Sequence, residues 1–249
     1  MPRQTANRFL ITTLALLLAA CGQGGGEPMP RDAGREELGL FTSLPIYWAE
    51  GQDIAAMLGP EAPQPGWVRD TLEQRARLVP LDTLEAEGLA PLEYLLIAQP
   101  RALSPAENVA LDDWVRAGGR ALVLADPFLT QHSEFALGDP RRPFDVVLIS
   151  PILARWGLEL RFDDQQDQTE RMVTLDGTRL PVELPGSFAL AGAGEDSDCS
   201  LSGEGLLARC RIGKGQVILL ADAALVDTEE DSQLRREALE SLLARLHAG

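Results

Sequence analysis

The most constraining feature of the sequence is one stretch, "EYLLIAQPRALSPAENVALDDWVRAGGRALVLADPF" (residues 93–128), in which two apolar runs flank a helix. Neither "EYLLIA" nor "RALVLA" alternates polar with apolar residues, as is typical of strands buried on both faces of a parallel sheet. Between them, Ser104-Pro105-Ala106-Glu107 is a capping box with proline at the first helical position, and Gly118 ends the helix. The stretch therefore predicts a right-handed strand, helix, strand unit and an α/β fold.

The rest of the chain extends this pattern. Further strands are predicted at residues 37–43, 77–81 and 215–222, and helices at 67–77, from Ser150-Pro151 to Gly157, and along the apolar stripe of Leu234, Ala238, Leu242 and Leu246. Periodicity leaves "PFDVVLIS" open between strand and helix. Short runs between residues 158 and 212 predict mostly antiparallel strands. We expect one three-layer α/β domain over residues 37–249, with a mostly parallel sheet and a β-rich insertion (158–212) before its last strand.

The first 36 residues differ from this body. Arg3 and Arg8 precede an apolar run, residues 9–20, that is too short for a permanent membrane span, and "LAAC" closes the run at Cys21. The alternative is a short membrane anchor with an incidental cysteine. The two arginines, the apolar run and "LAAC" together resemble the bacterial lipobox. The resemblance implies a signal peptide over residues 1–20, lipidation of Cys21 and a flexible tether over 21–36. Because Gly22 rather than aspartate follows, the resemblance implies the outer membrane, facing the periplasm.

The charge of the chain limits its partners. The formal net charge is -16, and removal of Arg3 and Arg8 with the signal peptide takes it to -18. So acidic a surface repels polyanions. We therefore expect no nucleic-acid partner.

Two other cysteines, Cys199 and Cys210, lie in "DSDCSLSGEGLLARCRIGKGQ". If Glu204-Gly205 forms a hairpin turn, the register places the two cysteines directly opposite each other, within reach of a disulfide. Free thiols and metal ligands are the alternatives, but no third and fourth ligand accompany the pair. We favour the disulfide and expect no metal and no cofactor.

The stretch at residues 93–127 resembles the core unit of the class I glutamine amidotransferase-like superfamily. It is most similar to a non-catalytic branch found in gliding-motility-type ABC transporter auxiliary proteins and an intraflagellar transport subunit, with its "LS" loop, "GG" and terminal "DP". "GKGQVILLADAALV" supports the resemblance more loosely. The enzymes of the superfamily carry a cysteine after this second strand, where the present chain has Ala125-Asp126-Pro127. The resemblance thus implies a domain without amidotransferase chemistry, since a cysteine nucleophile needs an adjacent base and no such pair is available.

In an open parallel sheet, ligands bind outside the carboxyl ends of the strands. The candidate crevice residues at those ends and on the loop after Asp126 are Ser43, Tyr47, Trp48, Asp126, His132, Arg141, Arg142 and Asp222. Asp126 is interpreted chiefly as an acid that caps the following turn, with catalysis as the alternative. His132 is interpreted as a solvated loop residue, since one histidine is no metal site.

Two further pairs remain open. Tyr47 and Trp48 are suited either to stacking a sugar or peptide or to covering the edge of the sheet. Arg141-Arg142 could clamp an anion or pair with nearby Asp139 and Asp145.

Two functions follow. The favoured one is a lipid-anchored, non-enzymatic binding or scaffolding protein, whose partners are the membrane, transporter subunits or another envelope protein. The alternative is a hydrolase-like enzyme that uses Asp126 and His132. We name no confident catalytic residue, because the chain lacks a nucleophile paired with a base.

Overall fold

The structure is a computed structural model that describes residues 35–50, 66–192, 194 and 196–247. The proposed signal peptide, Cys21 and most of the tether lie outside these residues. Residues 35–249 form one compact unit. Among the described helices, none is long and apolar enough to cross a membrane.

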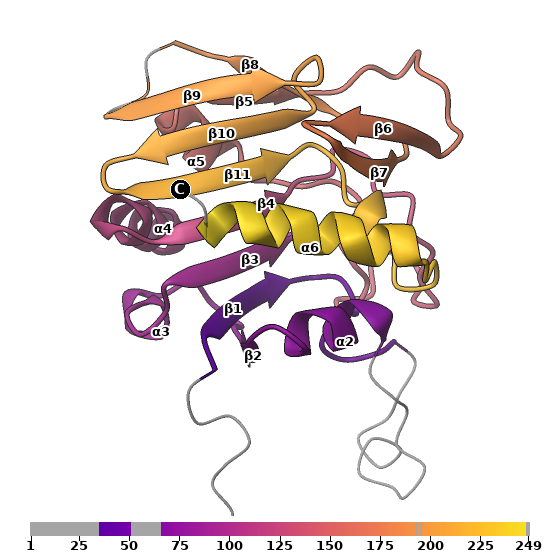
Figure 1. Ribbon diagram of the computed structural model, residues 1–249, viewed down its shortest axis with the longest axis horizontal. Helices are drawn as coiled ribbons and strands as arrows, with labels where there is room; N and C mark the ends of the chain where they lie inside the picture. The colour runs from indigo at the N-terminus through magenta and orange to yellow at the C-terminus, as the bar shows by residue number, and fades with distance from the viewer. Residues whose placement is uncertain (1–34, 51–65, 193, 195, 248–249) are drawn as a thin grey trace, which may run out of the picture. The chain divides into compact units, whose positions relative to one another are not determined.

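A seven-stranded, mostly parallel sheet forms the centre of this unit (Figure 1). Its strands, in spatial order, are β2 (Arg77–Pro80), β1 (Glu37–Thr42), β3 (Tyr94–Ala98), β4 (Arg120–Leu124), β11 (Gly215–Leu220), β10 (Leu207–Ile212) and β9 (Ser197–Ser202). The first five are parallel, whereas β10 and β9 are antiparallel to their neighbours. The mixed α/β class and the mostly parallel sheet agree with the sequence.

The predicted strand, helix, strand unit is present as β3, α4 (Pro105–Ala117) and β4. Ser104 Oγ accepts a hydrogen bond from Glu107 N, and the Glu107 carboxylate accepts one from Ser104 N, which completes the capping box. Gly118 ends the helix with a φ of 131°, a conformation that glycine adopts without strain. All five residues of β3 are buried, as expected of a strand covered on both faces.

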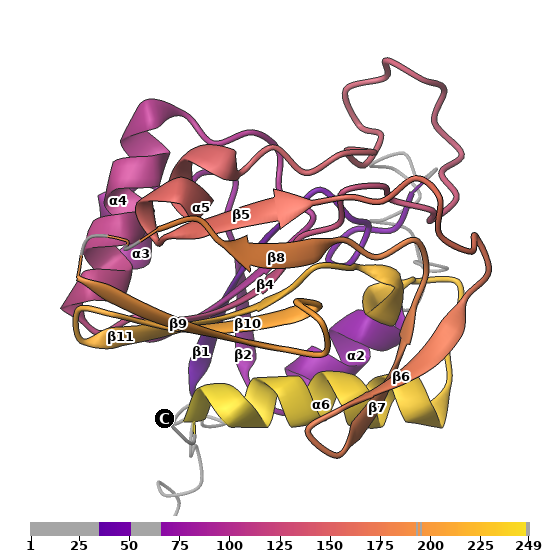
Figure 2. The same cartoon turned by 90° about the horizontal axis from the view of Figure 1, so that it is seen from above.

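Helices cover both faces of the sheet (Figure 2). On one face lie α2 (Trp67–Glu73) and α6 (Gln233–His247), and on the other lie α3 (Ala86–Leu89), α4 and α5 (Ser150–Arg155). The predicted helix 67–77 is four residues too long, because Arg77 N donates to Glu36 O and joins β2 to β1. The buried face of α6 is wider than the predicted stripe, since it also includes Leu239 and Leu243.

The β-rich segment 158–212 divides into three parts. Strand β5 (Leu158–Arg161) pairs with β8 (Ser187–Leu190), and β6 (Arg171–Leu175) pairs with β7 (Thr178–Val182). The third part, β9 and β10, extends the main sheet, where Cys199 lies opposite Cys210 and the two form a disulfide. The predicted hairpin register is therefore correct.

Candidate functional site

The carboxyl ends of the parallel strands meet at one edge of the sheet, as expected. The predicted residues separate there into a surface crevice, which includes Ser43, Tyr47, Trp48 and Arg141, and a buried acid pair, Asp126 and Asp222. His132 and Arg142 belong to neither group. The edge therefore holds two distinct environments rather than one convergent site.

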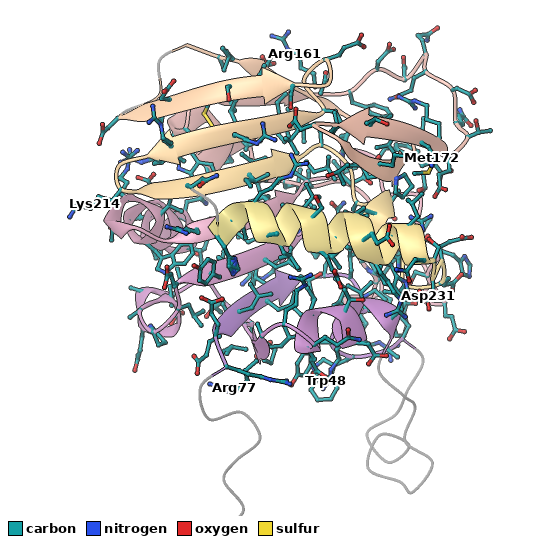
Figure 3. All side chains as sticks on the ribbon, viewed as in Figure 1. Trp48, Arg77, Arg161, Met172, Lys214 and Asp231 are labelled. Atoms are coloured by element: carbon teal, nitrogen blue, oxygen red, sulfur yellow. A yellow bond between two sulfur atoms is a disulfide. The ribbon has the colours of Figure 1, made fainter. Side chains whose placement is uncertain are left out.

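The crevice lies at the carboxyl ends of β1 and β2 and has a volume of about 310 Å³. Besides the four predicted residues, its polar and aromatic walls include Glu50, Asp82 and Phe135. Trp48 is 61% exposed and projects from the surface (Figure 3). The rings of Tyr47 and Trp48 meet edge to face, with centroids 4.9 Å apart.

Cation and aromatic contacts hold the walls of the crevice in place. The Arg69 guanidinium lies 4.2 Å from the ring centroid of Tyr47 and donates to Tyr47 O at 3.0 Å. Arg141 lies 4.2 Å from the ring of Phe135 and donates to both carboxylate oxygens of Asp139. These bonds from Arg141 lower the pKa of Asp139 to about 2. The charge of Arg141 is thus already paired, which favours the structural interpretation over an anion clamp.

Arg142 and His132 also lie on the loop after β4. Arg142 donates to Phe135 O and to Asp145 Oδ1, so both arginines take the partners foreseen in the structural alternative. His132 is exposed. Among the described residues, no group of three or more His, Cys, Asp or Glu side chains could hold a metal ion.

Ser43 and Gln99 fasten the strand ends to this loop. Ser43 Oγ donates to Gln99 O at 2.5 Å and accepts from Phe144 N. Gln99, which is fully buried and has a φ of 43°, donates to Asp126 O and Phe144 O and accepts from Asp126 N. Because the Ser43 proton is donated to a carbonyl, this hydroxyl is not activated as a nucleophile.

Asp126 makes the turn-capping contact predicted from the sequence, since its Oδ1 accepts from Phe128 N at 2.8 Å. Its Oδ2 accepts from Ala223 N at 3.1 Å, across to the segment that follows β11. Asp222 accepts from Ala224 N at 2.6 Å and from Glu183 N at 2.9 Å. Asp126 is 1% exposed and Asp222 is fully buried.

Burial dominates the titration of both acids. It raises the pKa of Asp126 to about 6, and the negative charge of Glu183 acts in the same direction. Burial, followed by the charge of Asp126, raises the pKa of Asp222 well above its ordinary value. No ion pair to either acid is found in the part of the chain that the structure describes. Burial and the lack of an ion pair therefore favour the protonated form of these two acids more than that of an exposed carboxyl.

Several residues of this edge were not singled out from the sequence. Asp82 and Phe135 line the crevice, and Glu183 faces the acid pair. Gln99 was not among the candidate crevice residues, because its positive φ and three side-chain bonds have no signature in a single sequence. Glu183 lies 57 positions after Asp126 in the chain and 39 before Asp222, so only the folded chain brings the three acids together.

The fold and this edge define a mixed α/β domain with an aromatic surface crevice and a buried acid pair. The family model described as "ABC-type uncharacterized transport system" matches residues 35–181, more than half of the chain. The chain belongs to this family, and the transporter-auxiliary part of the predicted resemblance is confirmed.

Solved structures with similar folds are distant in sequence. The "mmIFT52 N-terminal domain" is 13% identical with a TM-score of 0.52, over 84% of this chain and 95% of that one. The exo-beta-1,4-mannosidase Op5Man5 from Opitutaceae bacterium strain TAV5 is 15% identical with a TM-score of 0.48, over 85% of this chain. This chain spans 36% of that mannosidase. No curated protein matches the sequence.

Proposed function

We propose that this protein is a non-enzymatic auxiliary subunit of an ABC-type transport system, anchored through a lipid on Cys21 and facing the periplasm. Membership of the transport-system family is the observation that carries the proposal. The lipobox-like "LAAC" after an apolar run supports the anchor. With several acyl chains on Cys21, attachment to the membrane is stable.

The crevice is the proposed contact surface for a transporter subunit or another envelope protein. Trp48 is the most exposed aromatic side chain among the large apolar residues that the structure describes. Large, rigid aromatic residues with adjacent polar groups dominate binding at protein interfaces. The Tyr47 ring, on which the Arg69 guanidinium lies, contacts Trp48 edge to face, so little side-chain freedom is lost when a partner covers Trp48.

The hydrolase-like alternative receives no support from the positions of its two residues. Asp126 is 1% exposed and both of its carboxylate oxygens accept backbone N–H groups, whereas His132 is exposed on the loop. A general base needs to be within hydrogen-bond reach of a substrate proton.

The proposal extends to the ancestry of the fold. We take the domain to be a three-layer, flavodoxin-like relative of the amidotransferase-like superfamily. Helices on both faces of the sheet and the β3, α4, β4 unit with its terminal Asp126-Pro127 support this assignment.

The transporter association is tested by co-expressing the tagged protein with the ATPase and permease subunits of an ABC-type transport system from the same organism and measuring their co-purification. We expect both subunits to be retained, and Trp48→Ala to reduce retention at least tenfold. The matched control is Val109→Ala on α4, because Val109 has the same exposed fraction of 61%. No retention with the unmodified protein, or equal losses in the two variants, would contradict the proposal.

The anchor is tested separately. Cys21→Ser should abolish incorporation of labelled palmitate and move the protein from the membrane to the soluble fraction. The control is the double variant Cys199→Ser/Cys210→Ser, which removes the other two cysteines and should stay with the membrane. Membrane retention of Cys21→Ser without lipid label would refute lipidation.

A further inference from the structure

The acid pair joins three segments that are distant in the sequence. Asp126 ends β4 and binds the N–H of Ala223, at the entrance to the 3-10 helix η1 (Ala224–Val226). Asp222 binds the N–H of Glu183, which follows β7 and leads into β8. The two carboxylates thus fasten η1 and the β7–β8 connection to the end of the central sheet.

The charged groups around this junction are mostly negative. Glu183, the third acid, accepts a hydrogen bond from Thr130 Oγ1 at 3.0 Å. From α6, the buried Arg235 reaches the junction, but it donates to the carbonyl oxygen of Ala224 and to the Glu170 carboxylate. Neither acid of the pair receives that guanidinium, so two ionised carboxylates here would have no counterion among the residues that the structure describes.

We propose that the buried pair of Asp126 and Asp222 holds a proton in the closed junction, and that its loss to water releases η1 and the β7–β8 connection from the ends of β4 and β11. The junction is then a latch that is closed in mild acid and loosened in mild alkali. The proposal is independent of the transport role, because it depends only on the burial, the hydrogen bonds and the charges of this junction.

The direction of the effect follows from proton linkage. In the opened junction both carboxylates are solvated and lose their protons near their ordinary pKa of about 4. The pKa of Asp126 in the closed junction is raised to about 6. The closed state therefore binds more protons than the open state above pH 4, and its stability falls as the pH rises through 6. Between pH 5 and pH 8 this one group weakens closure about tenfold.

The test is residue-resolved amide hydrogen exchange on the full-length protein between pH 5 and pH 8, with each rate divided by its intrinsic rate at that pH. The reporters are the four amides that donate to the pair, those of Phe128, Glu183, Ala223 and Ala224. We expect their protection factors to fall at least about tenfold over this interval. The internal control is the amide of Leu84, which donates to the buried carboxylate of Glu107. Because the pKa of Glu107 is about 2, the protection of the Leu84 amide should stay constant over this interval.

Two variants connect the effect to the pair. Asp126→Asn removes one titrating group, and we expect the protection of Glu183 and Ala224 to lose most of its dependence on pH. Asp222→Asn removes the second titrating group and serves if the first variant does not fold: we expect a smaller dependence on pH at Glu183 and Ala224, whereas Phe128 and Ala223 should keep theirs, because burial still raises the pKa of Asp126. The same pH profile for the four reporters and Leu84 would overturn the proposal, as would a variant of either acid in which Glu183 and Ala224 keep the full pH dependence of the unmodified protein.

Discussion

Two sites in this molecule bury a carboxyl group, and their pKa values are shifted in opposite directions. Glu107 is 4% exposed and accepts the N–H groups of Leu84 and Ser104, much as Asp126 is 1% exposed and accepts those of Phe128 and Ala223. Arg101 donates to both carboxylate oxygens of Glu107 and holds its pKa at about 2. Burial without such a cation raises the pKa of Asp126 to about 6.

The difference shows that backbone donors alone do not stabilise a buried carboxylate against desolvation. Both acids accept two backbone N–H groups, but Glu107 faces a guanidinium and is less deeply buried, whereas Asp126 is deeply buried without a cation, and both differences act in the same direction. The Glu107 site, which joins the start of α4 to Leu84, therefore stays ionised above about pH 4.5. The β4–β11 side, fastened through Asp126 and Asp222, is sensitive around pH 6.

The largest expected effect comes from removing the cation of the first site. Arg101→Met leaves Glu107 buried with backbone donors only, and we expect the free energy of unfolding at pH 7 to fall by about 3 kcal/mol. Urea denaturation measures this loss. Arg161→Met is the control, since the Arg161–Glu159 pair is exposed on both sides and should contribute less than about 0.5 kcal/mol. Similar losses in both variants would show that the guanidinium is not what stabilises Glu107.

The second prediction distinguishes the stability that the disulfide contributes on the β4–β11 side from the stability that the acid pair contributes. Replacing Cys199 and Cys210 by serine removes the disulfide between β9 and β10, which should lower the free energy of unfolding by about 2 kcal/mol. A cross-link carries no titrating group, so this loss should be the same at pH 5 and pH 8. A loss that varies with pH would mean that the disulfide and the acid pair are coupled.

The third and smallest effect concerns Glu107 itself. Its pKa is lowered from an ordinary 4.5 to about 2, so its contribution is complete above pH 4.5 and is lost as the pH falls through 2. We expect Glu107→Gln to be about 1.5 kcal/mol less stable at pH 7, because the amide cannot accept at both positions. The gap should close as acid unfolding is followed towards pH 2. If the difference in the free energy of unfolding between the two proteins stays constant down to pH 2, its cause is packing rather than charge.

Local chemistry made much of this molecule predictable. The capping box of Ser104 and Glu107 and the facing cysteines follow from residue spacing, and both are present. The acid pair did not follow, because strand order is set by long-range packing, and only the adjacency of β4 and β11 brings Asp126 within contact of Ala223. The segment "PFDVVLIS" was ambiguous since its apolar residues follow neither period cleanly. Apart from Ser150, which begins α5, it is a loop along the sheet edge, where Val147 N donates to Asp126 O.

The position of β11 has a consequence for how the chain is made. β11 lies between β4 and β10, although it is the last strand in the sequence. During synthesis, β4 therefore has an unpaired, apolar edge until residue 220 has emerged, and Asp126 lacks its Ala223 donor until then. An edge of this kind recruits other strands, so the nascent chain passes through an aggregation-prone interval. Closing this edge depends on the C-terminal fifth of the protein, which is the last part of the chain to be made.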